Sequence, residues 1–245
     1  MTLIFAHRGY SLVYPENTMK SFVEAEKAGA DGVELDVQMT KDGELVVIHD
    51  EKVNRTTDGT GYVKDLTYQE IKKLNAHNKQ RKWYQKKTPI PTLAEVFEWM
   101  TANEIICNIE LKNGIIPYKG MEEKVVALIN KYKLNNRIII SSFNHYSIVY
   151  CNQLAPDIET APLLSESLYM PWIYAKSIKA QGIHPKYFRG LEDVFKLAMA
   201  NGIAVRPYTV NKEAALKRLF SIGCNAVITD DPSNAIRIRN EYFKA

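Results

Sequence analysis

The chain has 245 residues, of which 46% are hydrophobic and 24% are charged, and its formal net charge is +4. This length suits one large α/β domain, and the composition is that of an ordinary globular protein. Nucleic-acid-binding proteins usually carry a stronger and more clustered basic excess, so the charge favours at most an anionic small ligand or surface.

The cysteine content and the hydropathy pattern indicate the cellular compartment in which the protein is expected. Cys107, Cys151 and Cys224 lie far apart, and no CxxC spacing occurs, so neither a zinc site nor a disulfide framework is indicated. The N-terminal residues show no basic segment followed by a long apolar one, and no apolar run approaches the roughly 20 residues of a membrane span. We therefore expect a cytoplasmic protein without stable membrane insertion or a nucleic-acid partner; the oligomeric state is left open.

Short apolar segments of strand type alternate with amphipathic helical segments along almost the whole chain. The expected strands span residues 3–6, 33–37, 45–49, 106–111, 138–142, 159–164, 182–184, 204–210 and 226–229. The expected helices span about 18–28, 92–102, 121–132, 145–153, 190–200, 212–222 and 233–243, with Asn144 and Asn211 as N-cap residues. This alternation is typical of a parallel sheet with helical crossovers.

One connection cannot be a crossover. The strands at 33–37 and 45–49 are joined by a short linker, whereas parallel strands need a dozen or more residues between them, so we expect an antiparallel hairpin. Asp42-Gly43 is a favoured two-residue turn, and it would place Asp36 opposite His49. Removing the return strand leaves eight parallel candidates, the number in a TIM-type (β/α)8 barrel.

Residues 50–91 interrupt the alternation. They contain a glycine-rich turn at 58–61, the helix-capping pattern TYQE at 67–70 and the basic stretch KQRKWYQKK at 79–87. We interpret this segment as an insertion over the barrel mouth, within a single catalytic domain that covers residues 1–245. The aromatic residues of the basic stretch, Trp83 and Tyr84, leave open a lid that attracts anionic headgroups.

Polar side chains follow several expected strands, at the end where the active site of an α/β barrel lies. They are His7, Arg8, Glu34, Asp36, His49, Glu110 and Lys112. Period-two alternation places Glu34 and Asp36 on one face. Three carboxylates in a confined site need a countercharge, and Ca²⁺ or Mg²⁺ suits them better than zinc because both prefer oxygen ligands.

The remaining polar residues could bind an anion and transfer protons. Arg8 and Lys112 are available for an anion, and a phosphate matches a guanidinium fork beside a metal ion. Histidine is the side chain that ordinarily changes its charge near neutral pH, so His7 and His49 can serve as a general base and a general acid. Phosphodiester cleavage uses all of these parts.

The motifs together resemble the glycerophosphodiester phosphodiesterase family, in order from about residue 3 to the C-terminus. The resemblance is carried by HRG (7–9), PENT (15–18), ELDVQMTKDGELVVIHD (34–50), RTTDGTG (55–61), IPTLAEVF (90–97), IELK (109–112), SSF (141–143), YTVN (208–211) and ITDDP (228–232). The block from the paired acids to His-Asp, followed by the IELK strand, is its most specific part.

The resemblance implies a TIM-type barrel that hydrolyses glycerophosphodiesters to sn-glycerol 3-phosphate and an alcohol. It assigns Glu34, Asp36 and Glu110 to one divalent cation, Ca²⁺ or Mg²⁺, His7 and His49 to acid–base catalysis, and Arg8 and Lys112 to the phosphate. Which histidine is the acid, which metal and headgroup are preferred, and whether a cyclic phosphate forms are left open.

Three further residues and two other functions are weighed beside this assignment. Phe143, His184 and Tyr208 are candidates for lining the pocket, although core packing explains them equally well, and the family often has Trp where this chain has Tyr208. A lysophospholipase D-type activity on lipids would need an apolar groove, which the polar insertion disfavours. A non-catalytic phosphodiester-binding barrel should have broken catalytic positions, and none is missing here.

Overall fold

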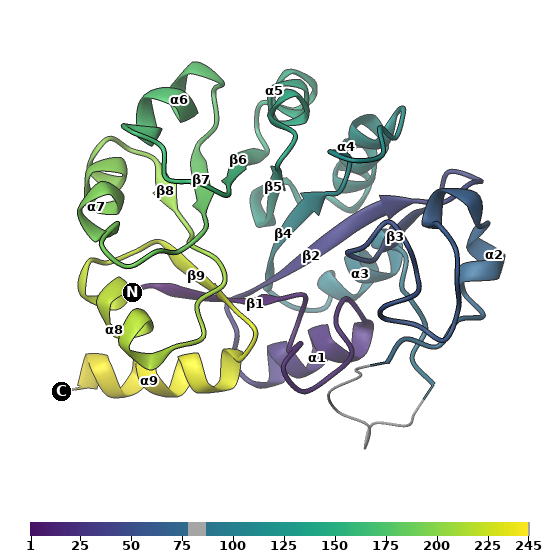
Figure 1. Ribbon diagram of the computed structural model, residues 1–245, viewed down its shortest axis with the longest axis horizontal. Coiled ribbons are helices and arrows are strands. Elements are labelled where there is room, and N and C mark those ends of the chain that lie inside the picture. The colour runs from purple at the N-terminus through teal and green to yellow at the C-terminus, as the bar shows by residue number, and fades with distance from the viewer. Residues whose placement is uncertain (78–86, 245) are drawn as a thin grey trace.

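The computed structural model describes residues 1–77 and 87–244. Trp83 and Tyr84, expected in a lid, lie outside the described residues. Eight parallel strands form a nearly closed barrel in the order β8-β7-β6-β5-β4-β2-β1-β9, which confirms the predicted TIM-type fold (Figure 1). They are β1 (Leu3–His7), β2 (Gly32–Met39), β4 (Ile106–Leu111), β5 (Ile138–Ser142), β6 (Glu159–Leu164), β7 (Gly182–Pro185), β8 (Ala204–Val205) and β9 (Ala226–Thr229).

Helices surround the strands, as Figure 1 shows. They are α1 (Met19–Lys27), α3 (Leu93–Met100), α4 (Met121–Tyr132), α5 (His145–Leu154), α6 (Pro171–Ser177), α7 (Glu192–Ala200), α8 (Glu213–Ser221) and α9 (Pro232–Lys244). The apolar faces of strands and helices pack into two large clusters, and a smaller cluster around Phe5 and Ile139 fills the barrel interior. The sequence did not predict α6, because this short helix has no side-chain N-cap and is announced only by Pro171 at its start.

The two expected N-caps have different outcomes. The Asn144 side chain accepts a hydrogen bond from the backbone N–H of Tyr146 at 3.2 Å, so it caps α5 as predicted. The prediction for Asn211 is wrong, since the N-cap of α8 is Lys212. The Asn211 carboxamide instead accepts from Thr229 and from the Asp230 backbone, both at 2.9 Å, so its oxygen is committed to the neighbouring strand end.

The hairpin forms as predicted, but its register is shifted by one residue. In β3 (Leu45–Val47), Val47 pairs with Val37, and the backbone N–H of Ile48 donates to Asp36 O at 2.9 Å, so His49 is not opposite Asp36. Residues 41–43 form a three-residue loop in place of the expected two-residue turn. Gly43 takes a left-handed φ of +82°, which this loop type requires at its last position.

The segment after β3 packs on the outer side of the hairpin. It contains the one-turn helices η1 (Val63–Asp65) and α2 (Tyr68–Ile71), and the predicted capping pattern at Thr67 and Glu70 is present. Its apolar residues form a cluster with the hairpin: Val46, Ile48, Val53, Val63, Ile71 and Ile90. The extent of a single domain over residues 1–245 stays a prediction. Among the described residues, no helix has both the length and the apolar character to cross a bilayer.

Candidate active site

Three buried carboxylates meet at the carboxyl ends of β2 and β4. Glu34 and Asp36 share the inward face of β2, and Asp36 pairs in register with Glu110 on β4. One oxygen from each carboxylate lies within 4.8 Å of the others. Burial, together with the neighbouring acidic charges, raises the pKa of Glu34 well above its usual range and that of Glu110 to about 7. A cluster with this much mutual repulsion is suited to a bound cation.

Asp36 differs from the other two carboxylates because its pKa is lowered. Burial opposes its charge, but the neighbouring cations Arg8 and Lys112, and a 2.8 Å hydrogen bond from Asn17, lower its pKa. Its second oxygen, Oδ1, is buried without a hydrogen-bond partner among the described residues. An unpartnered carboxylate oxygen beside two further carboxylates fits a hard, oxygen-seeking divalent cation such as Ca²⁺ or Mg²⁺.

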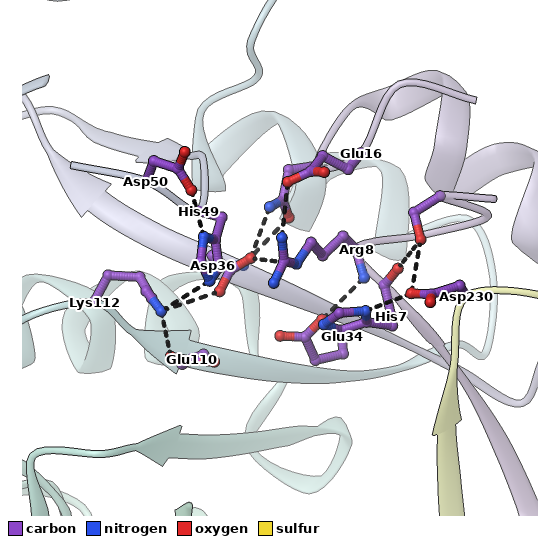
Figure 2. A network of polar contacts seen from close by, with 12 residues as sticks. His7, Arg8, Glu16, Glu34, Asp36, His49, Asp50, Glu110, Lys112 and Asp230 are labelled. Atoms are coloured by element: carbon purple, nitrogen blue, oxygen red, sulfur yellow. Dashed lines mark hydrogen bonds and ion pairs between the residues drawn. The ribbon is translucent and has the colours of Figure 1, made fainter. Parts of the chain in front are cut away.

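His7, at the end of β1, is oriented by a carboxylate from the far end of the sequence (Figure 2). Its Nδ1 lies 2.6 Å from Asp230 Oδ1, and Asn211 donates to Asp230 Oδ2 at 2.6 Å. Although burial opposes ionisation, the hydrogen bond and charge of His7 lower the pKa of Asp230, so this carboxylate only accepts. Nδ1 of His7 must therefore carry a proton, and Nε2 is the nitrogen left for chemistry.

His49 has the same arrangement with its sequence neighbour. Its Nδ1 lies 2.6 Å from Asp50 Oδ1, and hydrogen bonds from Arg55 and His49 overcome partial burial to lower the pKa of Asp50 to about 2. Nδ1 is thus the donor here too. The Lys112 ammonium donates to His49 Nε2 at 3.2 Å and to Glu110 at 2.7 Å, so it bridges the His49 ring and the carboxylate cluster. Burial lowers the pKa of His49, which favours the neutral ring.

Arg8 lies above the carboxylates in a left-handed backbone conformation, with φ of +57°. Its backbone N–H donates to Glu34 at 2.9 Å, and its guanidinium lies 3.4 Å from Asp36 and 2.9 Å from Glu16. Acidic neighbours outweigh burial and raise its pKa. Figure 2 shows that these contacts direct the guanidinium toward the same centre as Lys112.

The structure therefore brings the seven predicted polar residues together at one barrel mouth. Sequence reasoning missed the partners of these residues, which are Glu16, Asn17, Asp50, Arg55 and Asp230. Each lies inside a motif already quoted, but the pattern assigns it no partner, because those contacts join segments up to 223 residues apart.

The three candidate pocket residues differ in position. Phe143 borders two cavities of about 650 and 330 Å³, and its ring packs edge-on against Tyr208 with centroids 6.2 Å apart. His184 is completely buried on β7, and burial followed by the charge of Arg206 lowers its pKa well below its usual value. His184 borders neither of these two cavities.

Comparison with known proteins agrees with the motifs. The sequence model of the Glycerophosphoryl diester phosphodiesterase family matches residues 7–234. Proteins named glycerophosphodiester phosphodiesterase from Caldanaerobacter subterraneus and Bacillus altitudinis are 45% and 44% identical, covering 97% and 98% of this chain and 97% and 99% of their own.

A solved structure gives the same result at the level of the fold. A phosphodiesterase from Oleispira antarctica, in complex with the product sn-glycerol-3-phosphate, superposes with a TM-score of 0.84 at 29% identity, covering 100% of this chain and 98% of its own. Motifs, fold and relatives lead to one conclusion: the chain belongs to the glycerophosphoryl diester phosphodiesterase family.

Proposed function

We propose that the protein hydrolyses glycerophosphodiesters, releasing sn-glycerol 3-phosphate and an alcohol. The observation that carries this proposal is the convergence of three buried carboxylates, two carboxylate-paired histidines and two cationic side chains at one barrel mouth. The names of the relatives at 44–45% identity and the product bound to the Oleispira antarctica protein support this substrate class.

Glu34, Asp36 and Glu110 would hold one divalent cation, Ca²⁺ or Mg²⁺. When bound, such an ion supplies electrostatic stabilisation to the oxygens of the reacting phosphate. The unpartnered Asp36 Oδ1 and the raised pKa values of Glu34 and Glu110 support this assignment. Arg8 and Lys112 would neutralise the remaining phosphate charge, since both cations lie beside the cluster.

His7 and His49 would move the protons. One Nε2 accepts the proton of the nucleophile, which is water or the neighbouring glycerol hydroxyl, and the other donates a proton to the oxygen of the leaving alcohol. The ionised Asp230 and Asp50 hold each ring in the required tautomer and stabilise the imidazolium that forms. Phe143 and Tyr208 would contact substrate carbons at the mouth, and His184 would support that side from within the barrel.

We also propose a cytoplasmic location. Its support is that Cys107, Cys151 and Cys224 are all free and buried, which suits a reducing compartment.

The test measures released glycerol 3-phosphate from glycerophosphocholine and glycerophosphoethanolamine, and released choline from glycerophosphocholine and lysophosphatidylcholine, with and without chelator. We expect turnover of the water-soluble diesters, its loss on chelation and its return with Ca²⁺ or Mg²⁺. His7→Ala and His49→Ala should each lower kcat by about 10²- to 10⁴-fold with an unchanged circular dichroism spectrum. Full activity in either variant, or indifference to chelator, would contradict the proposal, and faster cleavage of lysophosphatidylcholine would favour the lipid alternative.

A further inference from the structure

We propose that Arg55, from the insertion, is a positioning residue that fixes the His49 ring and the Arg8 guanidinium relative to each other. The role rests on the proposed function, because it matters only if His49 moves a proton and Arg8 binds phosphate. No motif or chemical argument from the sequence assigns Arg55 a role.

The Arg55 guanidinium makes a two-bond contact with each of two carboxylates. Toward Asp50, Nε donates to Oδ2 at 2.7 Å and Nη2 donates to Oδ1 at 2.9 Å. Toward Glu16, Nη1 donates to Oε2 at 2.9 Å and Nη2 donates to Oε1 at 2.7 Å. Paired bonds of this kind fix the plane of each carboxylate as well as its distance.

In each of the two carboxylates, one oxygen contacts both Arg55 and a residue of the site. Asp50 Oδ1, which accepts from Arg55, is also the atom 2.6 Å from His49 Nδ1. Glu16 Oε1, which accepts from Arg55, also accepts from Arg8 Nη1 at 2.9 Å. One continuous chain of contacts therefore runs from the acid–base ring to the phosphate anchor, with the Arg55 Nη2 atom at its middle.

The chain of contacts joins segments that are far apart in the sequence, on the side of the site opposite Asp36 and Lys112. Arg8 follows β1 and Glu16 lies in the loop before α1, whereas His49 and Asp50 follow β3 and Arg55 belongs to the insertion. The Arg55 side chain is 45% exposed, and solvent weakens the contribution of exposed ion pairs to stability. Reaction rates depend on ring placement within about 1 Å, and a rigid guanidinium between two carboxylates supplies that constraint.

The test compares Arg55→Ala and Arg55→Lys with the wild type in the metal-supplemented full-length enzyme, using glycerophosphocholine. A lysine provides a point charge and cannot contact both carboxylates in planar pairs. We expect Arg55→Ala to lower kcat/KM by about 10²-fold. A misplaced His49 ring should lower kcat, and a misplaced Arg8 guanidinium should raise KM. Arg55→Lys should recover only part of the loss, and millimolar guanidinium should partly rescue Arg55→Ala.

A matched control is available on α9. Arg237 donates to both oxygens of Glu241 at 2.7 and 2.9 Å and is 54% exposed, and its hydrogen bonds to Glu241 and Asn234 stay within α9. Arg237→Ala should leave kcat and KM unchanged. A comparable loss in this control would overturn the specific role of Arg55.

A second measurement does not depend on turnover. The proton of the short His49 Nδ1–Asp50 hydrogen bond should have its own downfield NMR resonance, assigned by its disappearance in His49→Ala. It should shift or broaden in Arg55→Ala and stay in place in Arg237→Ala. If His49→Ala were fully active, the proposed function would fail whatever this resonance does. Wild-type kcat and KM in Arg55→Ala, or a lowered Tm as its sole defect, would instead overturn the positioning role.

Discussion

At the scale of single residues, a carboxylate orients each of the two histidines through Nδ1, and the two carboxylates come from unrelated segments. His7 donates from Nδ1 to Asp230, and His49 donates from Nδ1 to Asp50, each at 2.6 Å. Because both carboxylates are ionised, both rings present Nε2 to the centre of the site. The likeness is confined to Nδ1, because Nε2 of His49 also accepts from Lys112 at 3.2 Å.

Replacing Asp230 by Asn tests this assignment of ring nitrogens. An amide can donate to Nδ1, so the His7 ring would populate the tautomer with its proton on Nε2 and lose its function as an acceptor there. We expect kcat to fall by about 10²-fold or more, with a small change in KM.

Steady-state kinetics at saturating substrate measures this effect. The matched control is Asp231→Asn, one residue along the chain, whose carboxylate accepts from the backbone N–H of Asn234 at the start of α9. Asn can make the same cap, so this variant should retain full kcat. Equal kcat in the two variants would contradict the assignment.

The sequence was sufficient to predict the polar residues at the strand ends. It was not sufficient to predict the residues that only hold those side chains in place. His7, Glu34 and Glu110 were accessible because inward-facing polar residues in a barrel need a functional explanation. Asp230 and Asn17 were not, because their roles depend on which side chain they meet after folding. Asn17, in a left-handed conformation with φ of +57°, contacts Asp36 from a loop that the pattern describes only as the entry to a helix.

At the scale of elements, the hairpin shows how one residue of register changes a geometric prediction. An Asp-Gly pair serves equally in a two-residue turn and as the end of a three-residue loop. The Thr40 hydroxyl, which donates to Asp42 at 2.6 Å and accepts from the Glu44 N–H at 2.9 Å, stabilises the longer loop. His49 consequently lies beyond the paired part of β3, where its ring is held by side chains.

Gly43→Ala probes this loop. Gly43 has φ of +82°, a conformation that costs an L-residue about 1–2 kcal/mol, so the free energy of unfolding should fall by about that amount. The new Cβ would lie 2.6 Å from Lys124 Nζ, the end of a flexible side chain that can move aside.

Urea denaturation measures the change. Gly114→Ala is the control, since its Cβ would meet nothing within 4 Å, and it should cost far less. Gly43→Asn should lie between the two, because Asn tolerates the left-handed region. A neutral Gly43→Ala would rule out conformational strain as the reason for glycine here.

At the scale of the whole molecule, the alternation of strands and helices predicted a parallel sheet, and the count of eight parallel strands predicted the barrel. The features that were not predicted correctly are those that the local sequence pattern indicates only weakly, such as the ends of strands. β8 has two residues where seven were expected. Beyond it Pro207 has no N–H to donate, and pairing with β7 continues only as an isolated bridge between Lys186 and Tyr208. The clustering of charge at the barrel mouth is likewise a property of the assembled barrel.

This charge cluster makes stability depend on pH. The pKa of Glu110 is raised to about 7, so between pH 4.5 and 7 the folded protein retains a proton that the unfolded chain has released. Stability contributed by this group is therefore present at low pH and is lost as the pH rises through that window. In chelator, Glu110→Gln should gain stability over the wild type at pH 8 and show little gain at pH 4.5.

Denaturation midpoints of the two proteins at both pH values provide the measurement. Using the difference between them removes the opposite contribution of His49, whose lowered pKa favours stability at higher pH. Adding Ca²⁺ at pH 8 should stabilise the wild type, because an ion that binds only the folded form shifts the equilibrium toward it. An advantage of Glu110→Gln that is the same at pH 4.5 and 8 would contradict the prediction.

Because β8 is short, the barrel should open locally beside this strand before it unfolds as a whole on heating. The seam between β8 and β9 is held by few backbone contacts, among them Ile228 N–H to Pro207 O at 3.0 Å and Val210 N–H to Ile228 O at 2.8 Å. Just beyond this seam lie Asn211 and Asp230, which orient the His7 ring. Amide protons along the seam should therefore exchange with solvent sooner than those of β2 and β4, and such local opening would separate His7 from its carboxylate while the rest of the barrel is still closed.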